Sequence, residues 1–351
     1  MSWLMKRALE WYFKKLVAYR EHDKRIEKFM KDEIIAHYNK LSPYENKEEG
    51  LEEILNYKTR LWEAGTVEAL TICGGNMGFE NSVKNKVATD IAITLRLAFG
   101  YADIKDTDND DYDPRILSLK NLDKEAVKEK RHKHNIYQGM IKNLDELLLE
   151  RFKLLHPSTR DIFESESRNV EGAQAVDIKD HLCYLKGEFD NIRNRHSNIE
   201  SIMGVLEGKV GWMGRGAAKI AYIESGGRNN DIMDAEIRFF TSAGTLLQFR
   251  INDMKKLLND VENLDTNPII TYAICKYRAA DTISRELVIK VLKEDPTLLN
   301  RMAEPYEKEL SESLKKIKRF NFDSRTHKGL ALMVRSEAEK EKTNLLRTLK
   351  L

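Results

Sequence analysis

Apolar residues recur at helical spacing from the start of the chain. In the first forty residues the apolar positions are separated by three or four residues, with Lys and Arg between them: Leu4, Ala8, Tyr12, Leu16 and Tyr19. This spacing places the apolar side chains on one face of a helix. We therefore predict an amphipathic helix over residues 1–40, before the break at Ser42-Pro43.

Similar stripes continue through the first half. One comprises Val83, Val87, Ile91, Leu95 and Ala98, and another comprises Ile141, Leu144, Leu148, Phe152 and Leu155, ahead of Pro157. Between them, the acidic run from Asp103 to Asp113 is typical of a solvated loop, and the charged segment from Leu122 to His134 is typical of an exposed helix. The pattern predicts two buried helices separated by a polar connection.

The second half contains more interruptions. Helices are expected over 180–222, where five glycines permit close contact either between helices or with a phosphate backbone, and packing between helices is favoured: Gly204, Gly208, Gly211, Gly214 and Gly216. The segment Ser225–Asp231 is loop-like and is the expected lobe boundary. A stripe at Ile237, Phe240, Leu247 and Ile251 follows, and Pro268, Pro296 and Pro305 are expected to separate short helices.

Composition extends this pattern to a fold class. A chain of 351 residues with only 18 Gly and 6 Pro is long enough for two domains and favours helices. We predict an all-α fold of two helical lobes with an RNA-binding cleft between them and terminal exchange arms. The expected ranges are 1–40 for an N-terminal arm or first helix, 41–230 for the N-terminal lobe, 231–325 for the C-terminal lobe and 326–351 for a C-terminal arm.

Charge and cysteine usage limit the possible partners and compartments. The net charge is +2, so a polyanion would have to be bound by a local group of cations, and the basic stretch after Leu314 is the clearest asymmetry. Either a solvated helix face or a partner-binding arm explains that stretch. Cys73, Cys183 and Cys275 have neither disulfide nor zinc spacing, which favours a reducing compartment. No signal peptide or membrane-spanning stretch is apparent.

No motif predicts a catalytic, metal or cofactor site. The P-loop, dinucleotide-binding and nucleophile-elbow patterns are missing, and Gly74–Gly78 is best explained as a loop. The best enzymatic candidate is Arg193-Asn194-Arg195-His196, which resembles the Arg and His pair of HEPN-type ribonucleases but is more tightly spaced. His132 and His134 have basic neighbours that disfavour a metal cation. We therefore expect a protein that is not an enzyme.

RNA binding without sequence specificity requires cations for phosphates and polar groups for sugars, contributed by several elements. The candidate RNA-binding residues lie on both sides of the expected boundary: Lys153, Thr159, Arg168, Gln174, Arg193, Arg195, Asn321 and Arg325. This distribution favours binding in a cleft between lobes.

Several of these residues stand in segments that resemble nucleoproteins of non-segmented negative-strand RNA viruses, with a paramyxovirus-like pattern. The matching segments are Lys153–Thr159, Ser165–Arg168, Phe189–Arg195, Phe249–Met254, Asn321–Arg325 and Met333–Ser336. The resemblance implies that Lys153, Arg168 and Gln174 line an RNA groove, with Glu236 as a further groove residue. Arg250 stands where that family has Gly.

The leading hypothesis is therefore a viral nucleoprotein that encapsidates single-stranded genomic RNA. The resemblance implies homo-oligomerisation through terminal arms into a helical nucleocapsid, the template for replication and transcription, without membrane contact. The expected partners are RNA, further copies of the chain, and the viral polymerase with its cofactor. The expected location is the virion and the host cytoplasm, with the nucleus left open. A HEPN-like ribonuclease or a helical interaction scaffold is the alternative.

Overall fold

The structure is a computed structural model that describes residues 24, 26–42, 46–56, 60–77, 86–120, 122–277, 282–320 and 325–350. Within these ranges every regular element is a helix, which confirms the all-α prediction. The described residues give no support for an RNA-binding cleft or for exchange arms. None of their helices is both long and apolar enough to cross a membrane.

The chain forms two compact units, each built from three separate segments. Unit 1 comprises Met1–Ser165, Gly216–Ile237 and Lys316–Gly329, and unit 2 comprises Glu166–Arg215, Arg238–Lys315 and Leu330–Leu351. Four long helices contribute residues to both units: α8 (Pro157–Lys186), α12 (Asn230–Leu246), α16 (Leu298–Phe320) and α17 (Arg325–Thr348). The four functional ranges expected from the sequence stay a prediction, because units defined by packing need not coincide with functional domains.

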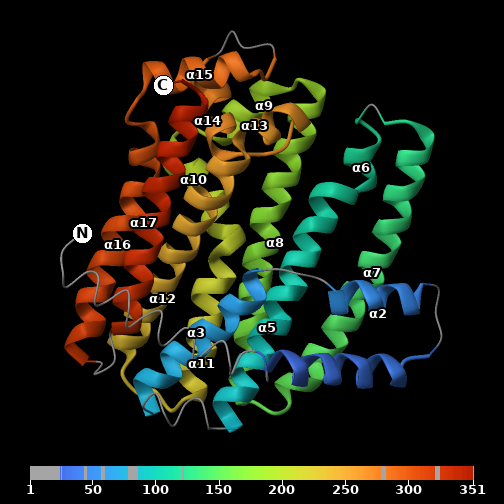
Figure 1. Cartoon of the computed structure of the whole chain (residues 1–351), viewed down its shortest axis with the longest axis vertical. Helices are drawn as coiled ribbons and strands as arrows, with labels where there is room; N and C mark the ends of the chain where they lie inside the picture. Colours follow the sequence, from blue (N-terminus) through green and yellow to red (C-terminus); the bar gives the residue numbers. More distant parts are fainter. Residues whose placement is uncertain are drawn as a thin grey trace. The chain divides into compact units, whose positions relative to one another are not determined.

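Unit 1 is organised around a helix that is buried on all sides. Its elements are helical residues 26–40, α2 (Lys47–Asn56), α3 (Arg60–Met77), α5 (Lys86–Thr107), the π-helical segment η1 (Asp108–Tyr112), α6 (Pro114–Leu117), α7 (Lys124–Phe152) and α11 (Ala217–Glu224). Every residue from Ile91 to Gly100 is buried, because α3, α7 and α11 all pack against α5 (Figure 1). Apart from Thr94 and Arg96, the buried residues of this stretch are apolar or glycine, as expected for a helix surrounded by others.

Besides its parts of the four long helices, unit 2 contains shorter helical elements. They are α9 (Phe189–Arg195), α10 (Ile199–Gly211), η2 (Trp212–Gly216), η3 (Leu247–Asp253), α13 (Met254–Asn263), α14 (Pro268–Lys276) and α15 (Arg285–Glu294). Two of these helices, α14 and α15, begin at capping residues: Asn267 accepts a hydrogen bond from the Ile269 amide at the start that contains Pro268, and Ser284 accepts one from the Leu287 amide. α14 packs against α9, α10, α13 and α15.

Three sequence expectations were wrong. The segment Gly74–Gly78 was expected to be a loop, but its described residues, up to Met77, belong to α3. Most of the run from Asp103 to Asp113 is helical, in α5 and η1, and Asp108 and Asp113 are buried. Pro305 does not separate two helices, because α16 runs through it. The charged segment from Leu122 to His134 does contribute to a helix, α7, which ends at Phe152 before α8 begins at Pro157.

Two glycines, Gly208 in α10 and Gly214 in η2, allow close packing. A Cβ on Gly208 would lie 2.6 Å from the Cβ of Ala173, and a Cβ on Gly214 would overlap the backbone of Thr241. Gly204 has open space at the same position. Contact between helices therefore explains two of the five glycines.

Candidate functional site

The candidate site in unit 2 centres on η3. This π-helical segment follows α12 and contains Gln248, Arg250 and Asp253. A π-helical turn inserts an extra residue into an α-helix and changes the direction in which side chains point, and such turns occur often at functional sites. Gln248 Nε2 donates a hydrogen bond of 3.2 Å to Asp253 Oδ1.

Asp253 is a carboxyl group with spare hydrogen-bonding capacity in the protein interior. Its residue is 8% exposed, and among the described residues Oδ2 has no hydrogen-bond partner. Burial raises the pKa of Asp253 well above its ordinary value of 3.8, while the charge of Lys209 acts in the opposite direction. A buried carboxyl group of this kind tends to hold its proton and can donate it in a hydrogen bond.

Lys209 supplies the cation of the cluster. Its Nζ lies 2.5 Å from Asp177 Oδ2, an ion pair that joins α10 to α8, and both side chains are largely buried. The charge of Lys209 also influences Asp253, and Asp177 contributes to the raised pKa of Asp253. A cation that is partly shielded from solvent interacts more strongly with an anion, such as a phosphate group, than an exposed cation does.

Asn267 fixes the far side of the cluster. Its Nδ2 donates to the carbonyl oxygen of Asp253 at 3.0 Å and to Asp260 Oδ2 at 2.8 Å. Burial, the largest cause, raises the pKa of Asp260 from 3.8 to about 6, and the hydrogen bond from Asn267 acts against it. The start of α14 is thereby tied to η3 and α13. We call Asp177, Lys209, Gln248, Asp253 and Asn267 the η3 cluster.

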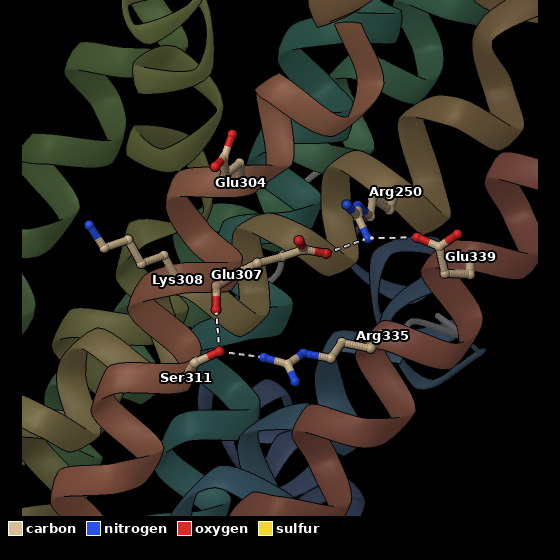
Figure 2. Close-up of a pocket in the computed structure, with 7 residues that line it drawn as sticks. All are labelled: Arg250, Glu304, Glu307, Lys308, Ser311, Arg335 and Glu339. Atoms are coloured by element: carbon tan, nitrogen blue, oxygen red, sulfur yellow. Dashed lines mark hydrogen bonds and ion pairs between the residues drawn. The ribbon is translucent and has the colours of Figure 1, made fainter. Parts of the chain in front are cut away.

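Arg250 takes part in a different group of contacts from the rest of η3. It lines a pocket of about 450 Å³ together with residues of α16 and α17. Figure 2 shows its guanidinium between two carboxylates, 2.7 Å from Glu307 Oε1 and 3.7 Å from Glu339 Oε1. Arg335 donates to Ser311 in the same pocket. These contacts connect Arg250 to Glu307 and Glu339, and Arg335 to Ser311, which is typical of a structural network.

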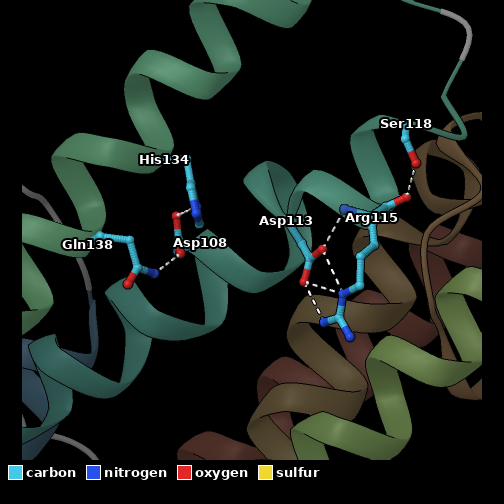
Figure 3. Close-up of polar contacts among 6 residues, drawn as sticks. All are labelled: Asp108, Asp113, Arg115, Ser118, His134 and Gln138. Atoms are coloured by element: carbon cyan, nitrogen blue, oxygen red, sulfur yellow. Dashed lines mark hydrogen bonds and ion pairs between the residues drawn. The ribbon is translucent and has the colours of Figure 1, made fainter.

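Unit 1 holds a second set of carboxylates at η1. Figure 3 shows Asp108 accepting from Gln138 Nε2 at 2.7 Å, with His134 Nδ1 at 2.9 Å. Asp113 accepts from the backbone amide of Arg115 at 2.7 Å and pairs with its guanidinium at 2.6 Å. These partners explain why the two residues are buried and not solvated.

The described carboxylates of each unit are not arranged to hold a divalent cation. Among the residues that the structure describes, no three His, Cys, Asp or Glu side chains are grouped to hold a metal ion. Asp108, Asp113 and Asp177 each already have a partner in a cationic, imidazole or amide group. A Mg²⁺ site requires free oxygen ligands in near-octahedral geometry, which three carboxylates with these partners do not provide.

The residues expected to bind RNA occupy varied environments. Lys153 and Arg168 are exposed, at the end of α7 and on α8. Thr159 is fully buried and donates to Glu224 Oε1 at 2.5 Å, and Gln174 is also buried. Glu236 is buried and lies 2.7 Å from His327 Nε2. The buried side chains contribute to packing within a unit and do not form an exposed groove.

The two arginines of α9 make internal contacts. Arg193 donates to the carbonyl oxygens of Ile274 and Tyr277, at 3.0 and 3.1 Å, and so holds the end of α14. Arg195 pairs with Asp180, and His196 Nε2 lies 2.6 Å from Oδ2 of the same carboxylate. Asn321 lies outside the described residues, as does the side chain of Arg325.

Sequence reasoning missed Asp177, Lys209, Gln248 and Asp253 as site residues. A signal was present in the last two, because Gln248 and Asp253 are polar residues inside the apolar pattern that runs from Ile237 through Leu257. The segment Phe249–Met254 was noticed only for its resemblance to nucleoproteins. Asp177 and Lys209 lie 32 residues apart on different helices, so only the fold brings them together.

Among comparisons with known proteins, only those with solved structures find a match. No protein-family model matches the chain, and no curated protein matches its sequence. Solved structures do match over nearly the whole chain. A decaprenyl diphosphate synthase from Rhodobacter capsulatus has a TM-score of 0.65 at 10% identity, covering 94% of this chain and 99% of that one.

Two further neighbours are geranylgeranyl diphosphate synthases. The protein from Corynebacterium glutamicum, solved with calcium and isoprenyl diphosphate, gives a TM-score of 0.61 at 12% identity, covering 93% of this chain and 97% of that one. The protein from Pyrococcus horikoshii Ot3 gives 0.58 at 17% identity, covering 92% and 99%.

These neighbours contradict the viral nucleoprotein hypothesis and what followed from it: RNA encapsidation, a non-enzymatic role, partnership with RNA and a viral polymerase, and location in a virion. The HEPN-like and scaffold alternatives do not fit either. The short motif matches arose in a helical chain rich in Lys, Arg and Asp, where such agreement occurs by chance. The chain has the fold of polyprenyl diphosphate synthases.

Proposed function

We propose that this protein is a cellular prenyltransferase that acts on isoprenyl diphosphates. The observation that carries the proposal is the likeness to polyprenyl diphosphate synthases over 90% or more of the chain. The η3 cluster adds support, because it places a cation and a carboxyl group with an unused oxygen in the interior of a helical unit. Fold likeness alone does not fix chemistry, so the assignment needs a direct test.

The proposed reaction joins two isoprenyl units. The bond between carbon and the bridging oxygen of one isoprenyl diphosphate breaks and diphosphate leaves, a carbon–carbon bond forms to the alkene of a second isoprenyl diphosphate, and a proton is lost. The developing negative charge lies on the leaving diphosphate. Preorganised cations and hydrogen-bond donors stabilise such charge.

Two groups of the η3 cluster suit that role. Lys209 is a cation whose position is fixed by Asp177, and a protonated Asp253 provides a hydrogen-bond donor beside it. In this proposal Lys209 binds a phosphate oxygen and Asp253 donates a hydrogen bond to the same diphosphate. Gln248 and Asn267 orient the Asp253 segment.

The test is an elongation assay. Purified protein is incubated with radiolabelled isopentenyl diphosphate and an allylic diphosphate, with and without added Mg²⁺, and extracted products are separated by chain length. The proposal requires longer labelled products. Lys209→Met should lower kcat/KM by about a hundredfold, as for loss of a group that stabilises transition-state charge.

The matched control is Lys219→Met, a lysine of α11 outside the cluster. It should retain wild-type activity, and thermal denaturation of both variants should show that they are folded. Absence of elongation in the folded wild-type protein, with and without Mg²⁺, would refute the proposed reaction. Equal activity of Lys209→Met and wild type would remove Lys209 from the site.

A further inference from the structure

A second pocket, in unit 1, is lined by cations and aliphatic side chains, and no acid is among the described residues that line it. It measures about 360 Å³, and its lining residues are Leu122, Lys124, Val127, Lys128 and Arg131. All of them belong to the start of α7 or to the residue before its cap, Asp123. The chemistry of this surface is therefore set by one short segment.

The three cations share one helix face. Lys124, Lys128 and Arg131 stand at positions i, i+4 and i+7 of α7, which brings them together on one side of the helix. All three are exposed. Glu125 and Glu129 occupy the neighbouring face and do not line the pocket. The positive charge at the pocket is therefore concentrated.

The aliphatic residues give the pocket a second character. Leu122 and Val127 are half-buried beside the cations, and Leu119 is an exposed large apolar side chain three residues before Leu122. The positive end of the α7 dipole adds to the charge, although Asp123 caps the amide of Ala126. Cations beside aliphatic side chains match an anion that carries an apolar portion.

We propose that this pocket binds the phosphate group of an anionic amphiphile. Arg131 contacts two phosphate oxygens, Lys124 and Lys128 act as point charges, and the adjoining apolar portion of the ligand lies along Leu122 and Val127. The ligand is either a phospholipid headgroup at a bilayer or a free phosphorylated compound. The site is separate from the η3 cluster and does not depend on the proposed prenyltransferase activity.

The experiment uses a charge-reversed pair with a matched control. Lys128→Glu/Arg131→Glu is compared with Lys316→Glu/Arg319→Glu, which changes a lysine and an arginine at the same i, i+3 spacing, both exposed, on α16. Sedimentation with vesicles of phosphatidylglycerol and phosphatidylcholine, and with phosphatidylcholine alone, gives the bilayer arm. Calorimetric titration with inorganic diphosphate gives the soluble arm.

The expected result is that wild type and the α16 control bind, while the α7 variant binds at least about fivefold more weakly for each charge changed. Loss confined to phosphatidylglycerol vesicles identifies a lipid headgroup as the source of the phosphate. Loss of one diphosphate-binding event identifies a soluble ligand. Equal binding by both variants, or no binding by wild type in either arm, would overturn the proposal. Circular dichroism checks that both variants fold.

Discussion

Gln248 and Asp253 lie five residues apart and are joined by a hydrogen bond of 3.2 Å within η3. In an α-helix, side chains that meet are three or four residues apart. The π-helical geometry of η3 therefore brings together two side chains that a regular helix would separate. It allows Asp253 to reach the surroundings of Lys209 while Arg250 contacts Glu307 and Glu339.

Replacing Asp253 with Asn should stabilise the protein at neutral and alkaline pH. The folded protein holds the Asp253 proton more strongly than the unfolded chain does, because burial raises its pKa above 3.8. The wild type therefore loses stability as pH rises from about 4 toward the folded pKa, and Asn removes that loss. Urea denaturation between about pH 4 and pH 8 measures it. Equal stability of wild type and variant at every pH would contradict the raised pKa.

Asp260→Asn should show the same sign over a defined range. The pKa of Asp260 is raised from 3.8 to about 6, a difference that corresponds to roughly 3 kcal/mol. The wild type loses no stability from ionisation of Asp260 below about pH 4, and the loss is complete above about pH 6. The Tm difference between variant and wild type should therefore grow between these pH values. The amide oxygen introduced by the substitution can still accept the hydrogen bond from Asn267. Exposed Asp161→Asn provides the control and should shift Tm equally at all pH values.

The Arg250 network should respond asymmetrically to mutation. Arg250 has a side-chain exposure of 3%, whereas that of Glu307 is 35%. Glu307→Ala leaves a buried guanidinium with only the more distant Glu339 and should cost about 3 kcal/mol. Arg250→Met leaves carboxylates that water can reach and should cost less. Chemical denaturation measures the free energy of unfolding of both variants. Glu304→Ala, which changes an exposed acid in the same pocket, is the control. A larger cost for Arg250→Met would contradict this account.

Gly214→Ala should destabilise unit 2, whereas Gly204→Ala should not. A methyl group at Gly214 would overlap the backbone of Thr241, so α12 or η2 must shift, at a cost of about 1–3 kcal/mol or more. Gly204 lies inside α10 with open space, where Ala should stabilise by about 0.5–1 kcal/mol. Differential scanning calorimetry of both variants measures the contrast. Equal Tm changes would mean that the close contact at Thr241 is relieved without cost.

The sequence was informative where local periodicity determines structure. The stripe containing Ile91 and Leu95 correctly predicted a buried helix, and the low Gly and Pro content correctly predicted an all-α chain. The acidic run failed because its burial depends on distant partners: Asp108 is paired by His134 and Gln138, 26 and 30 residues away. Local charge alone predicted solvent exposure.

The η3 cluster was not predictable for a related reason. Asp177, Lys209 and Asp253 stand on α8, α10 and η3, and no spacing rule connects them. The π-helical turn also brings together Gln248 and Asp253, whose spacing of five residues differs from the three or four residues that separate neighbouring side chains on an α-helix. Arg193 and Arg195 were expected to contact RNA. In the structure Arg193 donates to the carbonyl oxygen of Tyr277 and Arg195 pairs with Asp180, contacts that no local spacing indicates.

The division of unit 1 into three segments determines when unit 1 can fold during synthesis. Glu68 and Glu236 are buried in unit 1, where the charge of Glu236 adds to the effect of burial in raising the pKa of Glu68. His327, 91 residues after Glu236 in the chain, lies 2.7 Å from the Glu236 carboxylate. The ribosome synthesises Lys316–Gly329 after all the rest of unit 1 and after two of the three segments of unit 2. During synthesis the first two segments therefore lack the third, and their acidic interior residues lack His327 as a partner. Incompletely folded chains of this kind are prone to aggregation and are bound by chaperones. Native unit 1 can be completed only once residues near 327 have emerged.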